Sequence, residues 1–249
     1  MKQKKTRLDQ ALVQRSLVKS RQRGQALIMA GKVLVNELPA DKPGRAVTQL
    51  DRIVLKSDDI AYVSRGGLKL EAVVDKLGMR FDDAVCLDVG ASTGGFSDCL
   101  LQHGAKHVFA VDVGYGQLAW KLRQDPRVTV IERTNIRHIN PDKITCPVDV
   151  ITIDVSFISL KLVFDPVLQF ANQGAWVIAL IKPQFEVGKG QVGKGGVVRD
   201  AILHTAVIDN ITRFATDMGM TRKAMIPSPI LGPKGNREFL MVLKTGKSV

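Results

Sequence analysis

The sequence predicts a two-domain protein in which a small basic α+β domain precedes a larger α/β domain with a doubly wound, largely parallel sheet of seven strands. Three observations favour this fold class. The length of 249 residues suits one large or two modest domains. Residues 1–60 contain thirteen Lys and Arg but six Asp and Glu, so seven of the twelve excess positive charges lie in the first quarter. From about residue 63, apolar segments of strand length alternate with helical segments.

The first domain, predicted over residues 1–58, begins with two helices. Residues 7–12 place apolar side chains at the i, i+3 and i+4 spacing of one helix face. Ser20 is a favoured N-cap for a second helix over residues 21–30, and Gly31 is suited to end that helix.

Two strands complete the first domain, over residues 33–36 and 51–55, with a turn around Pro43-Gly44 between them. Residues 59–63 form the predicted linker, and the second domain spans residues 64–249. The candidate strands of the second domain are 84–89, 107–112, 127–131, 148–154, 175–181, 222–227 and 237–244. A turn rich in Pro and Gly precedes the last of them, so we expect that strand to form one arm of an antiparallel hairpin.

A glycine-rich turn directly follows the first strand of the second domain. The strand reaches Asp88, and the chain continues as Val-Gly-Ala-Ser-Thr-Gly-Gly to Phe96. Gly90 permits the turn, and the later glycines let the backbone approach a ligand without a Cβ in the way. A loop of this kind at the carboxyl end of a parallel strand is typical of an adenosine-cofactor site. The candidate cofactor-binding residues here are Asp88, Gly90, Ala91, Ser92, Thr93, Gly94, Gly95 and Phe96.

The next two strands supply the rest of the predicted cofactor site. The second strand ends at Asp112, whose carboxylate can accept hydrogen bonds from a ribose diol, and Val113 follows it. Asn135, after the third strand, is a candidate for contact with adenine. Position 92 is serine, so the Gly-x-Gly-x-x-Gly pattern of dinucleotide sites is incomplete. The pattern Asp-x-Gly-x-x-x-Gly-Gly therefore favours S-adenosylmethionine, with a nucleotide-free turn and an NAD site as the alternatives.

Four charged side chains lie where apolar segments give way to loops. Lys69 precedes the first strand of the second domain, Asp154 ends the fourth strand and Lys182 ends the fifth. Glu238 opens the last strand. Because the carboxyl ends of neighbouring parallel strands meet at one edge of a sheet, we expect Asp154 and Lys182 to lie together beside the cofactor. These four residues are the candidate catalytic residues.

Two lysines and two carboxylates suit methyl transfer to a ribose hydroxyl. This reaction requires in-line geometry and the loss of a proton from a weakly acidic O–H group. A lysine that lies beside a second cation in a partly desolvated site can take up that proton or stabilise the developing charge. The carboxylates would hold the lysines and help to orient the hydroxyl. Each of the four residues, taken singly, could instead be an ordinary surface group.

The overall composition limits the class of protein. A formal charge of +12 favours a polyanionic partner, because Lys and Arg contacts to phosphates give sequence-independent affinity, although a solvated cationic surface is the alternative. No segment approaches the ~18 consecutive apolar residues of a membrane span. No secretory signal begins the chain, so we expect a cytoplasmic location without membrane association. The three cysteines fit a reducing compartment and lack metal-ligand spacing, so no metal site is expected.

Residues 7–55 resemble an S4 domain, a small RNA-binding module. The resemblance is carried by Arg7-Leu-Asp-x-x-Leu12, Ser20-Arg21, Ala30-Gly31-x-Val33 and Asp51-x-Ile53. It implies that the basic face of the second helix meets RNA phosphates. The loop after Lys182 contains five glycines and two lysines, and we expect it to grip the substrate, with an ordinary flexible loop as the alternative. The candidate RNA-binding residues are Lys19, Arg21, Arg23, Lys32, Arg65, Lys189 and Lys194.

The second domain resembles the FtsJ-like ribose 2′-O-methyltransferases in its four candidate catalytic residues. Together with the S4-like domain it is similar to the TlyA family, whose members also bear the name hemolysin A. The further motifs that carry this resemblance are Ser64-Arg-Gly-Gly67, the 88–96 loop, Asp112-Val-Gly-Tyr-Gly-Gln-Leu-Ala-Trp120, Glu132-Arg-Thr-Asn135, Asp154-Val-Ser-Phe-Ile-Ser-Leu160, Lys182-Pro-Gln-Phe-Glu-Val-Gly-Lys-Gly190 and Gly232-Pro-x-Gly-Asn236.

The resemblance implies a Rossmann-like class I methyltransferase fold and the methylation of cytidine 2′-hydroxyls in ribosomal RNA, with S-adenosylmethionine as cofactor. Some members of the family modify both 16S and 23S rRNA, and others only 23S rRNA. The chain stops soon after its last predicted strand, as the shorter 23S-only members do, so we expect 23S rRNA or its subunit as the partner and leave 16S rRNA open. We expect a monomer. The alternatives are a membrane-active hemolysin and a non-catalytic RNA-binding factor of ribosome assembly.

Overall fold

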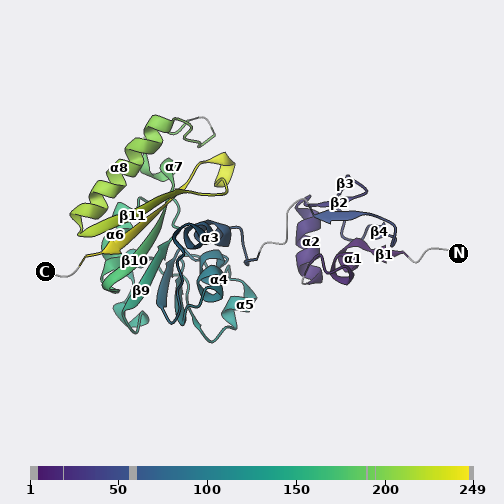
Figure 1. Ribbon diagram of the computed structural model, residues 1–249, viewed down its shortest axis with the longest axis horizontal. Coiled ribbons are helices and arrows are strands. Elements are labelled where there is room, and N and C mark those ends of the chain that lie inside the picture. Colours follow the sequence, from purple (N-terminus) through teal and green to yellow (C-terminus); the bar gives the residue numbers. More distant parts are fainter. Residues whose placement is uncertain (1–4, 19, 56–60, 189, 194, 247–249) are drawn as a thin grey trace. The chain divides into compact units, whose positions relative to one another are not determined.

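The structure is a computed structural model in which the chain divides into two compact units, residues 1–61 and 62–249 (Figure 1). The described residues are 5–18, 20–55, 61–188, 190–193 and 195–246. The predicted linker, residues 59–63, spans the division between the units, and its residues 59 and 60 lie outside the described residues.

The first unit packs two helices against small antiparallel sheets. Its elements are β1 (Thr6–Arg7), α1 (Leu8–Gln14), α2 (Arg21–Met29), β2 (Val33–Val35), β3 (Leu38–Ala40), β4 (Ala46–Val47) and β5 (Ile53–Leu55). β2 pairs with both β3 and β5, and β1 pairs with β4. The Ser20 hydroxyl accepts a hydrogen bond from the Arg23 amide at 3.2 Å and so caps α2, as expected. The short strands β3 and β4 occupy a stretch in which the sequence indicated only a turn.

A seven-stranded sheet forms the centre of the second unit, with the strand order β11-β12-β10-β9-β6-β7-β8. Its strands are β6 (Val85–Val89), β7 (His107–Val111), β8 (Val128–Ile131), β9 (Val148–Ile153), β10 (Ala171–Ile181), β11 (Met220–Pro227) and β12 (Phe239–Thr245). β12 runs antiparallel to β10 and β11, whereas the pairs among β6 to β10 are parallel. The α/β fold class and the closing antiparallel hairpin are therefore confirmed.

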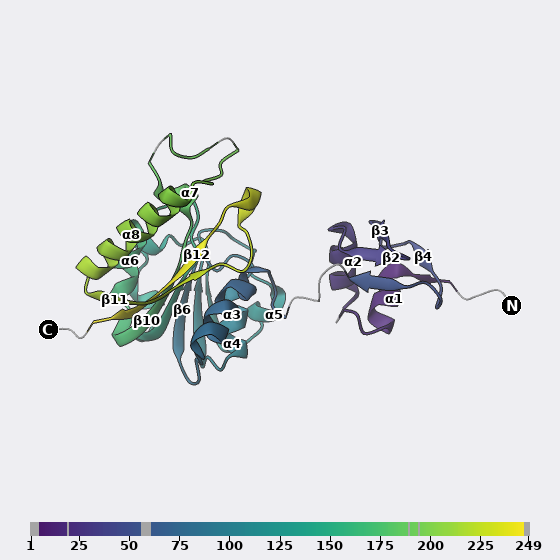
Figure 2. The same ribbon diagram turned by 45° about the horizontal axis from the view of Figure 1, so that its top comes forward.

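Helices cover both faces of this sheet. They are α3 (Gly66–Leu77), α4 (Gly95–Gln102), α5 (Trp120–Arg123), α6 (Lys161–Leu168), α7 (Pro183–Glu186) and α8 (Ala201–Asp217), with short 3₁₀ turns η1 (Ile136–His138), η2 (Pro141–Lys143) and η3 (Pro233–Gly235). α3 and α4 lie on one face, and α6 and α8 lie on the other (Figures 1 and 2). Strands covered on both sides are apolar along most of their length, which is why the sequence pattern identified them.

Two strands begin earlier than predicted: β11 by two residues, at Met220, and β10 by four. β10 starts at Ala171 rather than at residue 175, and its register with β9 is irregular between Ala171 and Trp176. Gly174 lies in this irregular stretch with φ +70°. The first residues of the strand are polar or small, so an apolar pattern could not reveal them. None of the helices in the described part of the chain is long and apolar enough to span a membrane.

Candidate active site

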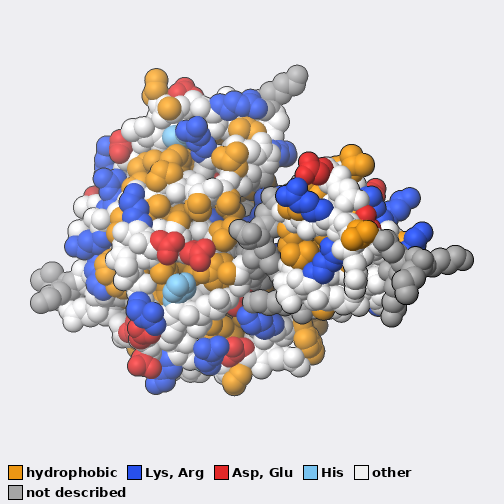
Figure 3. All heavy atoms as spheres, turned by 45° about the vertical axis from the view of Figure 1, so that its right-hand side comes forward, with side chains coloured by type: hydrophobic (Ala, Val, Ile, Leu, Met, Phe, Trp, Pro, Cys, Tyr) orange, Lys and Arg blue, Asp and Glu red, His pale blue; other side chains and the backbone are white. Residues whose placement is uncertain are grey.

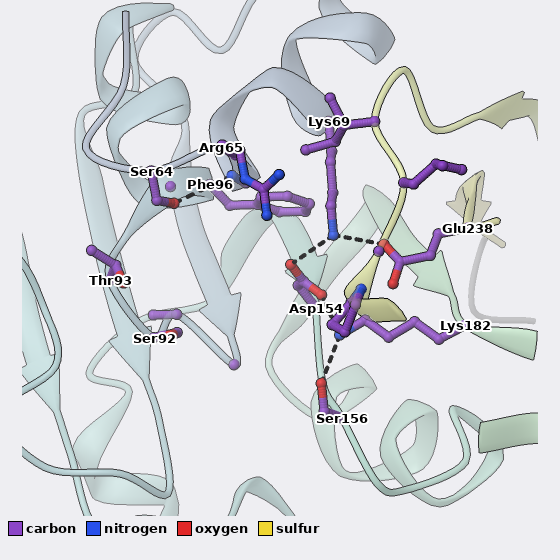
Figure 4. Close-up of a pocket in the computed structure, with 18 residues that line it drawn as sticks. Ser64, Arg65, Lys69, Ser92, Thr93, Phe96, Asp154, Ser156, Lys182 and Glu238 are labelled. Atoms are coloured by element: carbon purple, nitrogen blue, oxygen red, sulfur yellow. Dashed lines mark hydrogen bonds and ion pairs between the residues drawn. The ribbon is translucent and has the colours of Figure 1, made fainter. Parts of the chain in front are cut away.

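The four candidate catalytic residues meet at the edge of the sheet where β9 and β10 end (Figure 4). Lys69 lies on α3, Asp154 directly follows β9 and Lys182 directly follows β10. Glu238 immediately precedes β12, which is antiparallel to β10, so its first residues lie at the same edge. Parallel pairing of β9 with β10 thus places a carboxylate beside a lysine, as the sequence indicated.

Asp154 is the centre of this cluster. Its Oδ1 lies 2.7 Å from the Nζ of Lys182, and its Oδ2 lies 3.8 Å from the Nζ of Lys69. Lys69 also donates a hydrogen bond to Glu238 at 2.7 Å, and Lys182 donates one to Ser156 at 2.8 Å. Two ammonium groups therefore face two carboxylates, so each buried charge has a partner of opposite sign.

The cluster is shielded from solvent except on one side. Lys69 and Lys182 are each 8% exposed and Glu238 is 2% exposed, whereas the side chain of Asp154 is 20% exposed. The four side chains line a cavity of about 340 Å³. A hydroxyl group bound in this cavity would meet fixed charges from which most water is excluded, and such charges act more strongly than they do in water.

The glycine-rich loop after β6 packs directly against the end of β9. Gly90 has φ +83°, and a Cβ at this position would lie 2.7 Å from the carbonyl oxygen of Asp154. The amide of Asp154 in turn donates a hydrogen bond to the carbonyl of Val89 at 2.9 Å. Only glycine suits both this backbone conformation and this contact, so Gly90 sets the spacing between the loop and Asp154.

A second cavity, of about 740 Å³, adjoins the first and is called the cofactor cleft below. Its size lies within the range of small-molecule sites. Asp112, Val113 and Asn135 line it, so three of the residues proposed from the sequence lie together. The cleft and the catalytic cavity have four wall residues in common, namely Gly90, Ser92, Asp154 and Ser156.

Asp112 is held in place at the wall of the cleft by backbone amides. Its Oδ2 accepts a hydrogen bond from the Ser92 amide at 2.8 Å, and its Oδ1 accepts one from the Gly114 amide at 2.6 Å. Each oxygen keeps further acceptor capacity. Next to it, the exposed Val113 offers an apolar surface. This set fits S-adenosylmethionine: the carboxylate suits a ribose diol, the apolar surface suits adenine, and the shared wall leads to the charged cluster.

The rest of the predicted loop residues divide between the cavity wall and the interior. Ala91, Thr93, Gly95 and Phe96 line the catalytic cavity together with Gly90 and Ser92. Asp88 and Gly94 line neither cavity. Gly94 has φ +94° and is the N-cap of α4, and a Cβ at this position would meet the side chains of Leu118 and Leu122.

Asp88 is fully buried beneath the loop. Its carboxylate accepts hydrogen bonds from the Ser97 hydroxyl at 2.6 Å and from the Thr152 hydroxyl at 2.9 Å. Burial raises the pKa of this carboxyl group to about 6, and the two hydrogen bonds offset only part of the effect. Asp88 therefore connects β6, β9 and α4 from below the loop, and the structure places it away from the cofactor cleft.

The candidate RNA-binding residues lie in both units. Arg21 and Lys32 are exposed and Arg23 is half-buried in the first unit, while Arg65 is exposed in the second and lines the catalytic cavity. Figure 3 shows Lys and Arg side chains on the visible surface of both units. Lys19, Lys189 and Lys194 lie outside the described residues.

The structure adds residues to the site that were not among the candidate site residues, although several of them belong to the quoted motifs. The Ser156 hydroxyl accepts a hydrogen bond from the ammonium group of Lys182. Ser156 lies two residues after Asp154, so the motif that begins at Asp154 already contained it. Phe157 is 89% exposed with φ +64°, and its ring lies 4.8 Å from that of Phe185 at the wall of the cofactor cleft. Residues 230–233 form another wall of the catalytic cavity; their last two residues open the Gly232-Pro-x-Gly-Asn236 motif, whereas the first two lie outside every motif.

Comparison with known proteins agrees with this architecture. The FtsJ-like methyltransferase family matches residues 62–245, and the S4 domain matches residues 6–53. The 16S/23S rRNA (cytidine-2′-O)-methyltransferase TlyA of Mycobacterium tuberculosis is 46% identical over 97% of this chain and 91% of its own length. Hemolysin A of Brachyspira hyodysenteriae is 41% identical over 94% of this chain and 98% of its own length. A solved Streptococcus thermophilus structure with a hemolysin name shares 42% identity and a TM-score of 0.77, covering 98% of this chain and 90% of that one.

Fold and site together define an S4-domain methyltransferase of the FtsJ-like class, whose cofactor is S-adenosylmethionine. Within this class the chain belongs to the TlyA family. The family predicted from the sequence motifs is thus confirmed.

Proposed function

We propose that this protein transfers a methyl group from S-adenosylmethionine to the 2′-hydroxyl of a cytidine in ribosomal RNA. One observation carries the proposal: the cofactor cleft and the catalytic cavity share the wall formed by Gly90, Ser92, Asp154 and Ser156. A hydroxyl bound beside Asp154 would therefore lie next to the methyl-bearing end of a cofactor in the cleft. The S4 domain and the rRNA methyltransferase among the relatives support RNA as the substrate.

Each of the four charged residues has a task in this reaction. The bound cofactor supplies an electrophilic methyl group. Asp154 fixes Lys69 and Lys182 on its two oxygens, and Glu238 holds Lys69 from the other side. Lys182 is the base for the hydroxyl: after its own ammonium group has lost a proton to solvent, the neutral amine accepts the hydroxyl proton as the oxygen attacks the methyl group, and the positive charge of Lys69 stabilises the attacking oxygen. Because these groups are already paired and buried, little reorganisation is needed during the reaction.

The cofactor residues act by binding and spacing. Asp112 accepts hydrogen bonds from the ribose hydroxyls, and Asn135 contacts adenine. The backbone of the 90–96 loop, close to Asp154 because of Gly90, sets the distance between the cofactor and the substrate hydroxyl. A small change in that distance would reduce the rate, since methyl transfer requires aligned reacting atoms.

The substrate is 23S rRNA, and 16S rRNA is a second candidate because the Mycobacterium tuberculosis relative is named for both. A ribosomal substrate places the reaction in the cytoplasm.

Mapping the methylated nucleotides tests the proposal. Large and small ribosomal subunits from cells that lack this protein would be incubated with it and S-adenosylmethionine, and 2′-O-methyl groups would be located by reverse transcription at low nucleotide concentration. New stops at a cytidine in the 23S rRNA are expected. Methylation only on a base, or none in either subunit, would contradict the proposal.

A further inference from the structure

Asp9 in the first unit is a charged residue with no exposed side-chain surface. Its Oδ1 accepts a hydrogen bond from the Nε of Arg7 at 3.1 Å, and its Oδ2 accepts one from the Nη2 of Arg7 at 3.1 Å. The same Oδ2 accepts hydrogen bonds from the Nε of Arg21 at 3.0 Å and from the Nε2 of Gln25 at 2.8 Å. One buried carboxylate therefore holds two guanidinium groups.

The helices of the first unit create this arrangement. Arg7 immediately precedes α1, and Asp9 lies in its first turn. Arg21 is the first residue of α2, and Gln25 lies one turn further along the same face. Between them lies the buried Gly24, where α2 packs against α1: a Cβ at this position would be in van der Waals contact with the carbonyl oxygen of Asp9, at 3.4 Å.

The two arginines keep much of their surface open to solvent. The side chains of Arg7 and Arg21 are 47% and 52% exposed, although both contact a fully buried group. A guanidinium has five N–H donors, and these contacts use two of them on Arg7 and one on Arg21. Two positive charges and one negative charge leave the group with a net positive charge.

The carboxylate of Asp9 remains ionised under ordinary conditions. Hydrogen bonds, first from Arg7 and then from Gln25 and Arg21, hold the pKa of Asp9 well below its usual range. The arginines are therefore held by a permanent charge and by fork-like hydrogen bonds, which restrict long side chains that would otherwise sample many rotamers.

We propose that Asp9 is a positioning residue that holds Arg7 and Arg21 as a paired clamp for the phosphates of the RNA backbone. The proposal rests on RNA as the substrate, as stated under the proposed function. Two planar guanidinium groups suit bidentate contact with phosphate oxygens. Their prior orientation reduces the entropy that RNA binding would otherwise cost.

The direction in which RNA affinity changes on Asp9→Asn distinguishes a positioning role from an effect of overall charge. Asp9→Asn adds one unit of positive charge to a basic unit, so bulk electrostatics predicts tighter RNA binding. Loss of the clamp predicts weaker binding, by roughly fivefold or more, because two side chains must then be ordered during binding. Glu37→Gln is the matched control: it adds the same charge in the same unit, where Glu37 forms an exposed pair with Arg52.

The experiment measures the affinity of the full chain for isolated large ribosomal subunits at several salt concentrations. Wild type, Asp9→Asn and Glu37→Gln would be compared, with thermal unfolding and S-adenosylmethionine affinity as checks on folding. Arg7→Lys conserves the charge but lacks the planar fork, so it tests the same proposal if Asp9→Asn does not fold. Weaker binding is expected for Asp9→Asn and Arg7→Lys, and unchanged or tighter binding for Glu37→Gln.

A double-substitution cycle adds a readout that a general structural role would not produce. In an Arg7→Ala, Arg21→Ala background, Asp9→Asn should have little further effect on RNA affinity. Three results would overturn the proposal. They are additive losses of RNA affinity in the cycle, an Asp9→Asn protein that binds RNA as tightly as Glu37→Gln, and an unchanged RNA affinity for Arg7→Lys. If wild type neither binds nor methylates ribosomal subunits, the proposed function itself fails, which is a different result.

Discussion

Lys69 and Lys182 are held by the two oxygens of a single carboxylate, that of Asp154. The contacts are unequal: Lys182 lies at 2.7 Å, whereas Lys69 lies at 3.8 Å and has its shorter contact, 2.7 Å, with Glu238. Both lysines thus contact Asp154, and the shorter contact of Lys69 with Glu238 leaves the Asp154 carboxylate paired mainly with Lys182. This division leaves Lys182 as the lysine most closely coupled to the reacting site.

Glu238→Gln is expected to disturb this division. Lys69 would lose its nearest carboxylate and compete with Lys182 for Asp154, so kcat should fall by roughly tenfold or more. Removing one partner of a buried ion pair also costs about 3–5 kcal/mol of folding stability. Single-turnover methyl transfer and urea unfolding measure the two effects, with the exposed Asp165→Asn as the control. Turnover of Glu238→Gln at the wild-type rate would show that the carboxylate of Glu238 is not needed to position Lys69 for catalysis.

Asp112→Ala should weaken cofactor binding. The substitution removes the acceptor for the ribose hydroxyls and also frees the amides of Ser92 and Gly114, which shape the wall of the cleft. We expect the Kd for S-adenosylmethionine to rise about tenfold or more, since each lost charged hydrogen bond is worth about 1.5–3 kcal/mol. Titration calorimetry measures this, with the exposed Asp142→Ala as the control. An unchanged Kd would remove the ribose-diol role from Asp112.

Gly90→Ala tests the spacing between the loop and the catalytic cluster. The added Cβ would meet the carbonyl oxygen of Asp154 at 2.7 Å, and the residue would have to keep φ near +83°. The loop must therefore shift, and we expect both a weaker cofactor Kd and a lower kcat at saturating cofactor. Gly116→Ala is a control, because its φ is also positive and no atom lies within 4 Å of its Cβ position. Equal behaviour of the two variants would indicate that strain alone, and not the contact with Asp154, is responsible.

Asp88 gives the methyltransferase unit a pH-dependent stability. Its pKa is about 6 in the folded protein against an ordinary value of 3.8, so the folded state binds the proton more tightly than the unfolded state. The stability that this proton provides is complete below about pH 4 and is lost as the pH rises through 6. Asp88→Asn should remove this loss of stability, so the unfolding free energy of Asp88→Asn relative to wild type should increase by about 2 kcal/mol between pH 4 and pH 7. Urea unfolding of both proteins across this range measures the difference, and a difference that stays constant with pH would show that burial does not raise the pKa of Asp88.

Much of this protein could be predicted from its sequence because its strands are buried on both faces. Such strands are continuous apolar segments, and Asp154 and Lys182 stand out because each ends one of them. Glu238 and Lys69 could be proposed from the motif resemblance, but their mutual contact joins positions far apart in the sequence and depends on how β12 and α3 pack. No local pattern specifies that packing.

Other features depended on three-dimensional contacts that a sequence pattern does not contain. Asp88 opens the glycine-rich motif and so looked like a cofactor ligand, yet its hydroxyl partners Ser97 and Thr152 come from α4 and β9. The polar start of β10 was missed because residues near Gly174 carry no apolar alternation. Ser156 was in a recognised motif, but its contact with Lys182 became visible only when the ends of β9 and β10 were placed together.

Methyl transfer by Lys182→Ala at saturating cofactor tests the central claim most directly. Wild type, Lys182→Ala and the exposed control Lys106→Ala would be incubated with large ribosomal subunits and labelled S-adenosylmethionine, and cofactor affinity would be measured in parallel. The account predicts that Lys182→Ala loses about a hundredfold or more in rate while its cofactor Kd stays within about twofold of wild type, because Lys182 acts on the hydroxyl and lies outside the cofactor cleft. A Lys182→Ala protein that methylates the subunits at the wild-type rate would contradict it.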